Sequence, residues 1–122
     1  LFHSDSRVRL EAVKCLGSLE GELPREWVER VLEDEDGRVA EGGVVQFGKT
    51  RLQVAVQPLI GLLQRRDTMG RNKSLRIRAL QALGEIGKLA KPAGPLIRQA
   101  LNENSVHVRD AAQAALEKIG GN

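Results

Sequence analysis

Apolar and polar positions repeat along the chain in three segments that align without a gap. Each segment places an apolar residue, an arginine, an alanine and two more aliphatic residues at fixed spacings. The apolar positions fall 0, 4, 8 and 11 residues after the first, which is one face of an α-helix and not the period-two pattern of a strand. The pattern therefore predicts three similar helices, over residues 6–19, 73–86 and 106–119. The aligned columns are Val8/Leu75/Val108, Arg9/Arg76/Arg109, Ala12/Ala79/Ala112, Leu16/Leu83/Leu116 and Leu19/Ile86/Ile119.

A weaker fourth copy lies between the first two, over residues 37–50. Val39, Gly43 and Phe47 take its apolar positions, and Ala40 stands where the other copies have arginine. The arginine column is then spaced by 31, 36 and 33 residues (9 to 40, 40 to 76, 76 to 109). These spacings are the length of one helix–turn–helix unit and indicate a repeat architecture.

Partner helices are predicted between these copies, over residues 25–34, 52–66 and 95–102, with Trp27 packed inside. Pro24 and Pro95 suit a first helical turn, where a missing N–H does no harm, whereas Pro58 must begin a new helix or kink one. Helix ends are indicated by capping residues and by terminating glycines. The expected N-caps are Asp5, Asp36, Ser74 and Ser105, and the expected terminating glycines are Gly21, Gly87 and Gly120.

The motif of an apolar residue, Arg-x-x-Ala-x-x-x-Leu-Gly-x-Ile-Gly, as in residues 75–87, resembles the HEAT-like repeats first described in phycobilisome lyases. The resemblance covers nearly the whole chain as about 3.5 repeats. It implies an all-α fold, a right-handed α-solenoid of antiparallel helix pairs whose second helices line a concave face where partners bind. Residues 1–122 would form a single HEAT-like domain, part of a longer protein, with an open surface near Leu10 and Val13 because the first repeat lacks its first helix.

Composition narrows the function. Aromatic residues make up only 2% of the chain, which argues against a stacking platform for bases. Residues 1–41 hold eleven acids and six bases, a net −5, whereas residues 42–122 hold five acids and thirteen bases, a net +8. That field could steer an acidic partner towards the second half. No apolar run is long enough to span a membrane. The single Cys15 excludes an internal disulfide, is expected to be buried, and favours a reducing, cytoplasmic setting.

Catalytic signals are weak. Residues 43–50 match a phosphate-binding loop, a glycine and four residues followed by Gly-Lys-Thr. No buried strand precedes them and their apolar residues obey the repeat register, so we interpret the match as coincidence. His3 and His107 are too isolated for a zinc site, and His107 is expected on the surface. The sequence thus predicts no enzyme and no catalytic, cofactor-binding or metal-binding residue.

Binding residues are predicted from the arginine column and from one long turn. Arg9 is expected to pair with Asp36, whereas Arg76 and Arg109 have acids missing from the matching position and are expected to be more open. The 36-residue spacing indicates an insertion of about five residues in the turn at 67–73, and long turns in compact stacks are often functional. The candidate partner-binding residues are Arg65, Arg66, Arg71, Lys73, Arg76 and Arg78, together with Lys14, Lys49 and Gln81 on outward positions.

The outward positions of the repeat are mixed in charge, which favours a protein partner over a polyphosphate. We therefore expect a non-catalytic scaffold or adaptor module that binds protein. Two alternatives stay open: a nucleic-acid-binding module that uses the basic second half, or an accessory subunit of a lyase-type enzyme. The predicted outward residues are Glu11, Lys14, Ser18, Gly42, Val45, Lys49, Arg78, Gln81, Glu85, Ala111, Ala114 and Lys118.

Overall fold

The computed structural model describes residues 3–15, 24–51, 53–64 and 70–120, without the side chains of residues 70–72. Every regular element in these residues is helical, which confirms the all-α prediction. The α-helices are α1 (Ser6–Lys14), α2 (Arg25–Leu32), α3 (Gly37–Lys49), α4 (Val56–Leu63), α5 (Gly70–Ile86), α6 (Gly94–Ala100) and α7 (Val106–Ile119), with 3-10 segments η2 (Gln53–Ala55) and η3 (Gly87–Ala93).

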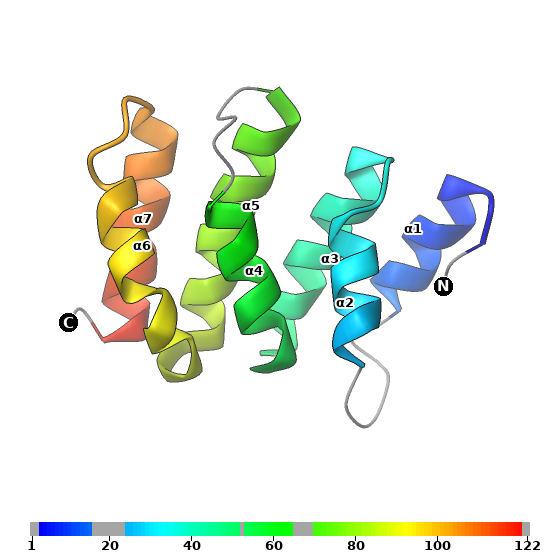
Figure 1. The fold of residues 1–122 in the computed structure, drawn as a ribbon, viewed down its shortest axis with the longest axis horizontal. Helices are drawn as coiled ribbons and strands as arrows, with labels where there is room; N and C mark the ends of the chain where they lie inside the picture. Colours follow the sequence, from blue (N-terminus) through cyan, green and yellow to red (C-terminus); the bar gives the residue numbers. More distant parts are fainter. Residues whose placement is uncertain (1–2, 16–23, 52, 65–69, 121–122) are drawn as a thin grey trace.

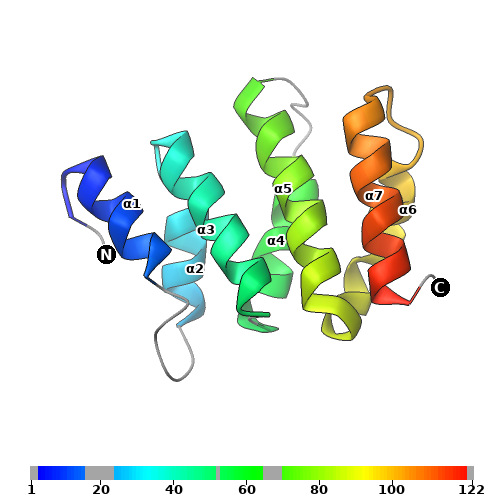
Figure 2. The same ribbon diagram turned by 180° about the vertical axis from the view of Figure 1, so that it is seen from behind.

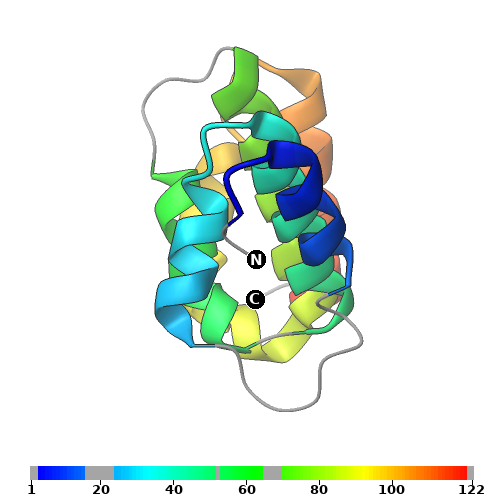
Figure 3. The same cartoon turned by 90° about the vertical axis from the view of Figure 1, so that its right-hand side faces the viewer.

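The helices form two layers (Figures 1 and 3). Helices α2, α4 and α6 make a first layer, and α1, α3, α5 and α7 make a second layer that Figure 2 shows in front. Along the second layer each helix packs on the next, and α2, α4 and α6 each pack on the second-layer helix that follows in sequence. None of the described helices is long and apolar enough to cross a membrane.

Second-layer helices begin and end largely where the sequence indicates. The side chains of Asp5, Asp36 and Ser105 each accept a hydrogen bond from a first-turn backbone N–H, as N-caps do. Gly87 and Gly120 follow the last residues of α5 and α7 with φ of +77° and +122°, a conformation that glycine adopts freely. Gly21 lies outside the described residues.

Ser74 is not an N-cap, because α5 begins four residues earlier at Gly70. Arg76 is therefore the seventh residue of α5, whereas Arg9, Ala40 and Arg109 are each the fourth residue of their helices. Part of the insertion predicted at 67–73 thus lengthens a helix by about one turn, and α5 rises above its neighbours in Figure 1.

First-layer helices follow the prolines. Pro24 is the N-cap residue of α2 and Pro95 lies in the first turn of α6. Pro58 lies in the first turn of α4, and the chain before it is the separate 3-10 turn η2. A new helix thus begins close to Pro58, as predicted, because there its missing N–H has no helical partner to lose.

The core lies between the two layers. Val39, Leu75 and Val108 of the first apolar column are at most 1% exposed. Val8 of the same column is 45% exposed, so the prediction of a buried Val8 is wrong. Helix α1 ends the row and packs mainly on α3, which leaves part of its surface to solvent. An open apolar surface was expected near Leu10 and Val13. Val13 is completely buried, and Val8 is the exposed apolar residue on α1 instead.

Two more burial predictions are wrong. Trp27 on α2 is 41% exposed, although it was expected inside, because α2 buries Val28, Val31 and Leu32 instead. Cys15 is exposed at the end of α1 and is not a buried thiol.

Candidate partner-binding surface

The match to a phosphate-binding loop falls inside a helix. Residues 43–49 belong to α3, and the Thr50 hydroxyl donates to the Gln46 carbonyl oxygen at 2.9 Å. A phosphate-binding loop presents free backbone N–H groups, whereas an α-helix uses them internally. The structure therefore supports the interpretation of this match as coincidence.

The glycines of α3 are explained by close packing. A Cβ at Gly43 would lie 2.3 Å from Cγ1 of Val31, and a Cβ at Gly48 would lie 2.8 Å from the Cα of Ala82. The same contact recurs one unit later, because a Cβ at Gly84 would lie 3.1 Å from the Cα of Ala115. Glycine thus lets α3 approach α5, and α5 approach α7, almost to backbone contact.

Arg9 binds an acid of the next unit, but a different one from the predicted Asp36. Its Nε and Nη2 donate to the two carboxylate oxygens of Asp34 at 2.8 and 3.0 Å. This hydrogen bond raises the pKa of Arg9. Burial raises the pKa of Asp34, but the hydrogen bonds from Arg9 and the Asp36 N–H and the charge of Arg9 together lower it below its usual value. Asp36 caps α3 and pairs with the exposed Arg38.

Arg76 is also paired, so the expectation that it lies open is wrong. Its side chain is 6% exposed, and Nη1 donates to Oε1 of Glu103 at 2.6 Å while Nη2 donates to Oε2. The hydrogen bonds to Glu103 raise the pKa of Arg76. Arg109 is half-buried, and its Nη1 donates to the carbonyl oxygens of Glu103 and Asn104 at 2.7 and 2.9 Å. The arginine column therefore ties turns together, and Arg76 presents little surface to a partner.

The basic turn is only partly described. Arg65 and Arg66 lie outside the described residues, and so does the side chain of Arg71. Lys73 is half-buried, and Arg78 is exposed with its Nε 3.8 Å from the Glu41 carboxylate. Among the described residues of this predicted cluster, Arg78 is thus the most exposed, whereas Arg76 is buried in its ion pair with Glu103.

The outer face of the second layer, which is turned away from the first layer, carries most of the predicted outward residues. Lys14, Lys49, Arg78 and Gln81 are exposed. Ala111 is 7% exposed and is therefore wrongly predicted, because it faces the neighbouring α5 at the bottom of a groove. Ser18 lies outside the described residues. The other exposed outward residues are Glu11, Glu85, Ala114 and Lys118, while Gly42 and Val45 are half-buried.

Two grooves indent this face. The first, here called the α5/α7 groove, has a volume of about 480 Å³ and is lined by Ile77, Gln81, Glu85, His107, Asp110, Ala111, Ala114 and Lys118. The second, here called the basic groove, has a volume of about 590 Å³ at the C-terminal ends of α3 and α5. It is lined by Lys49, Arg51, Gly84, Glu85, Ile86, Gly87, Lys88 and Lys118. Glu85 and Lys118 line both grooves, so the two are adjacent.

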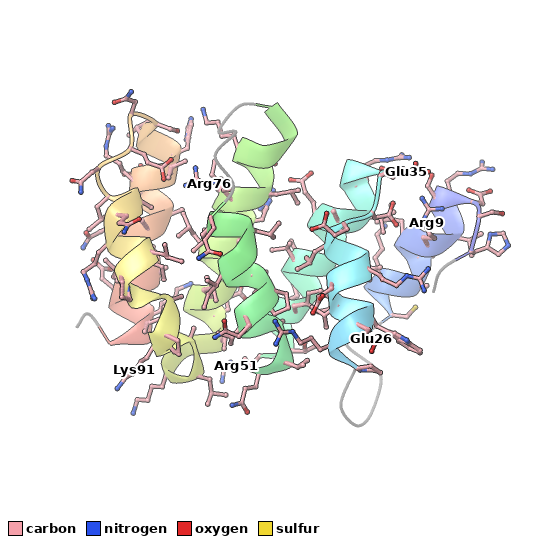
Figure 4. The ribbon with its side chains drawn as sticks, in the orientation of Figure 1. Arg9, Glu26, Glu35, Arg51, Arg76 and Lys91 are labelled. Carbon is pink, nitrogen blue, oxygen red and sulfur yellow. The ribbon has the colours of Figure 1, made fainter. Side chains whose placement is uncertain are left out.

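Sequence reasoning missed three basic residues of the second groove as binding candidates. Arg51, Lys88 and Lys118 come from three different helix ends, and only the fold brings them to Lys49. In Figure 4 the labelled Arg51 lies at the lower edge of the row of helices, and Arg76 lies in its upper part. Lys118 was expected outward, but no sequence signal joined it to the others.

The described residues contain no group of three or more His, Cys, Asp or Glu side chains placed to hold a metal ion. His107 is exposed in the first turn of α7, as predicted. It lines the α5/α7 groove beside Asp110 and Gln81. This groove can therefore offer hydrogen bonds and charges to a partner.

A family model matches part of the chain. Residues 75–103 match the PBS lyase HEAT-like repeat, a segment that runs from α5 through η3 and α6 and includes both Arg76 and Glu103. No curated protein matches the chain. The matched segment contains one second-layer helix, one first-layer helix and the ion pair that links it to the next unit. Residues 75–103, which are 29 of the 122 residues, are therefore identified as similar to one PBS lyase HEAT-like repeat unit.

Proposed function

We propose that the chain is a non-catalytic protein-binding module, a right-handed solenoid of about 3.5 HEAT-like units that holds a partner on the outer face of its second layer. One observation carries the proposal. The inner faces of α3, α5 and α7 are buried in the core, while their outer faces present exposed polar side chains beside two adjoining grooves. Apolar lining residues give a bound protein segment affinity, and polar lining residues fix its orientation. A groove that has both kinds therefore suits such a segment.

The family supports the same function, because HEAT-like repeats generally mediate protein interactions. In such proteins each repeat packs only on its neighbours, so the repeats form a long, continuous stack. The extended surface of that stack suits protein partners. Lys14, Lys49, Arg78 and Gln81 remain our candidate contact residues on this face. Arg65, Arg66, Arg71 and Lys73 remain candidates for a second contact at the basic turn.

Nucleic-acid binding is the second candidate function, because the basic groove carries four cationic side chains. Binding to duplex DNA would weaken steeply between 50 and 200 mM salt, since phosphate contacts release counterions. Absence of binding at low salt would remove this candidate.

A matched pair of substitutions tests the proposed function. Gln81→Trp on the outer face of α5 puts a bulky, uncharged side chain beside the α5/α7 groove, and Gln99→Trp makes the same change at an exposed first-layer position on α6. We expect affinity capture from the source cell to lose its specific partner with Gln81→Trp and to keep it with Gln99→Trp. Equal recovery with both variants and with an added Ala114→Trp would contradict binding on this face.

A further inference from the structure

The basic groove concentrates one charge. Lys49, Arg51, Lys88 and Lys118 line it, with Glu85 as the one acidic lining residue. Lys49, Lys88 and Lys118 are exposed, and none of these four cations forms an ion pair with another described residue. Cations gathered around one hollow repel one another unless an anion joins them. The groove is therefore complementary to a negatively charged ligand.

Arg51 occupies a position that is glycine in the next two units, whereas the first unit has Glu20 there. It lies eleven residues after Ala40, just as Gly87 and Gly120 lie eleven residues after Arg76 and Arg109. All three have positive φ, and Arg51, at +51°, is the one non-glycine residue in the described chain that does. The left-handed region is unfavourable for a residue with a Cβ. The sequence thus places a guanidinium at the groove at a cost in backbone energy.

Helix dipoles explain only part of this cluster. Lys49 and Lys118 lie in the last turns of α3 and α7, where cations stabilise the partial negative charge of a helix C-terminus. Arg51 and Lys88 lie beyond the ends of α3 and α5, and glycine at position 51 would end α3 at lower conformational energy. A ligand that needs the cation explains the choice of arginine there.

The adjoining α5/α7 groove adds apolar surface. Ile77, Ala111 and Ala114 line it, and Lys118 belongs to both grooves. We propose that the two grooves together bind an acidic segment of a partner protein, with aliphatic side chains against Ala111 and Ala114 and carboxylates against Lys88, Lys118 and Arg51. This inference rests on the proposed function and specifies the chemistry of the partner.

Nucleic acid fits the two grooves less well. Glu85 lines both of them and Asp110 lines the α5/α7 groove, so a regularly charged backbone would meet fixed negative charge along its path. The groove linings contain no Phe, Tyr or Trp for bases to stack on. A peptide can place its carboxylates at one end and apolar or basic residues at the other.

The first experiment measures fluorescence anisotropy of a labelled synthetic twelve-residue peptide of Leu, Ala, Glu and Asp, at 20 mM salt. We expect it to bind, and we expect the matched peptide with Gln and Asn in place of the acids not to bind. Lys88→Glu with Lys118→Glu should weaken binding roughly tenfold or more, because attraction becomes repulsion. The control Arg25→Glu with Arg98→Glu changes the net charge equally, at exposed first-layer positions outside both grooves, and should stay within about twofold.

The second experiment separates binding from folding at Arg51. Arg51→Gly should raise the thermal unfolding midpoint, because glycine accepts positive φ, and should weaken binding of the acidic peptide. Arg51→Ala should weaken binding equally without the rise in midpoint. Binding unchanged in both variants would overturn the role of the guanidinium.

Two outcomes overturn the proposal as a whole. One is no binding of the acidic peptide at 20 mM salt. The other is tight binding of duplex DNA that Lys88→Glu with Lys118→Glu abolishes, which would assign the groove to nucleic acid. The two proposals fail separately. If Gln81→Trp abolishes partner capture while Lys88→Glu with Lys118→Glu leaves it intact, the proposed function stands, but the partner does not bind through an acidic segment.

Discussion

The junction between α5 and α7 and the junction between α3 and α5 share their packing but differ in their charges. In both, a glycine lets two backbones approach: Gly84 at Ala115 and Gly48 at Ala82. Only the α5/α7 junction adds the buried pair of Arg76 and Glu103. Close backbone packing is thus common to both junctions, and the ion pair is an addition to it.

At the α3/α5 junction both members of the ion pair are absent from the sequence. Asp34 and Glu103 each lie six residues before the next position of the arginine column, and each pairs with the arginine of the preceding unit. At the α3/α5 junction that arginine is Ala40 and the residue six before Arg76 is Gly70. One charge left without the other would be strongly destabilising in a buried turn. Arginine and acid therefore behave as one structural unit.

A different contact takes their place. Glu41 of α3 accepts a hydrogen bond from the Ser74 hydroxyl, and its carboxylate lies 3.8 Å from Nε of Arg78. The Arg78 side chain is 49% exposed and the Glu41 side chain 36% exposed, so the ion pair is screened by water. The α3/α5 junction should thus depend on packing more than the α5/α7 junction does.

The largest expected effect comes from breaking the buried pair. Arg76→Ala should lower the free energy of unfolding by about 3 kcal/mol, because Glu103 is left partly buried without its partner. Arg78→Ala, at the junction with the exposed pair, should cost less than about 0.5 kcal/mol. Urea unfolding of both variants measures the difference, and equal losses would contradict the contrast between the junctions.

The shared glycine contact should come next. Gly48→Ala should destabilise the fold by about 1–3 kcal/mol, because its Cβ would meet the backbone of Ala82. Gly61→Ala in α4 is the control, since nothing lies within 4 Å of the added Cβ. Alanine there should stabilise the helix by about 0.5–1 kcal/mol. If urea unfolding shows Gly48→Ala to be neutral, α3 and α5 do not pack as closely as described.

A smaller, opposite effect is expected at the end of α3. Arg51→Gly should increase the free energy of unfolding by about 1 kcal/mol, because it removes a side chain from a left-handed residue. It would make the end of α3 like the ends of α5 and α7. A loss of stability measured by urea unfolding would mean that the Arg51 side chain stabilises the fold itself.

The smallest effect concerns acid pH. The folded state lowers the pKa of Asp34 below the ordinary value of 3.8. The unfolded chain then binds more protons in this range, so the stabilisation from Asp34 is present above about pH 5 and is lost as pH falls through the folded pKa. Asp34→Asn should flatten the decline of the unfolding midpoint below about pH 4. An unchanged acid decline would contradict the Arg9–Asp34 pair.

The sequence predicted the helices well because their apolar faces repeat with helical period. The caps Asp5 and Asp36 and the glycines Gly87 and Gly120 followed from local rules that need no tertiary information. Ser74 was misassigned because the start of α5 depends on how the inserted residues fold, and no periodic pattern specifies that.

The binding surface was harder to predict. Arg76 was expected to be open because we sought its acid at the capping position, four residues before the next arginine, whereas Glu103 lies six before it. The basic groove gathers residues as distant in sequence as Lys49 and Lys118, which only stacking brings together. One signal was present: Arg51 stands where the next two units have Gly87 and Gly120.

The claim that a buried ion pair stabilises the α5/α7 junction is tested most directly by a double-mutant cycle between Arg76 and Glu103, measured by urea unfolding. We expect Arg76→Ala and Glu103→Ala to be non-additive, with a coupling free energy of about 1.5 kcal/mol or more. Additive losses, within about 0.3 kcal/mol, would show that the two side chains do not interact and would contradict this account of the stack.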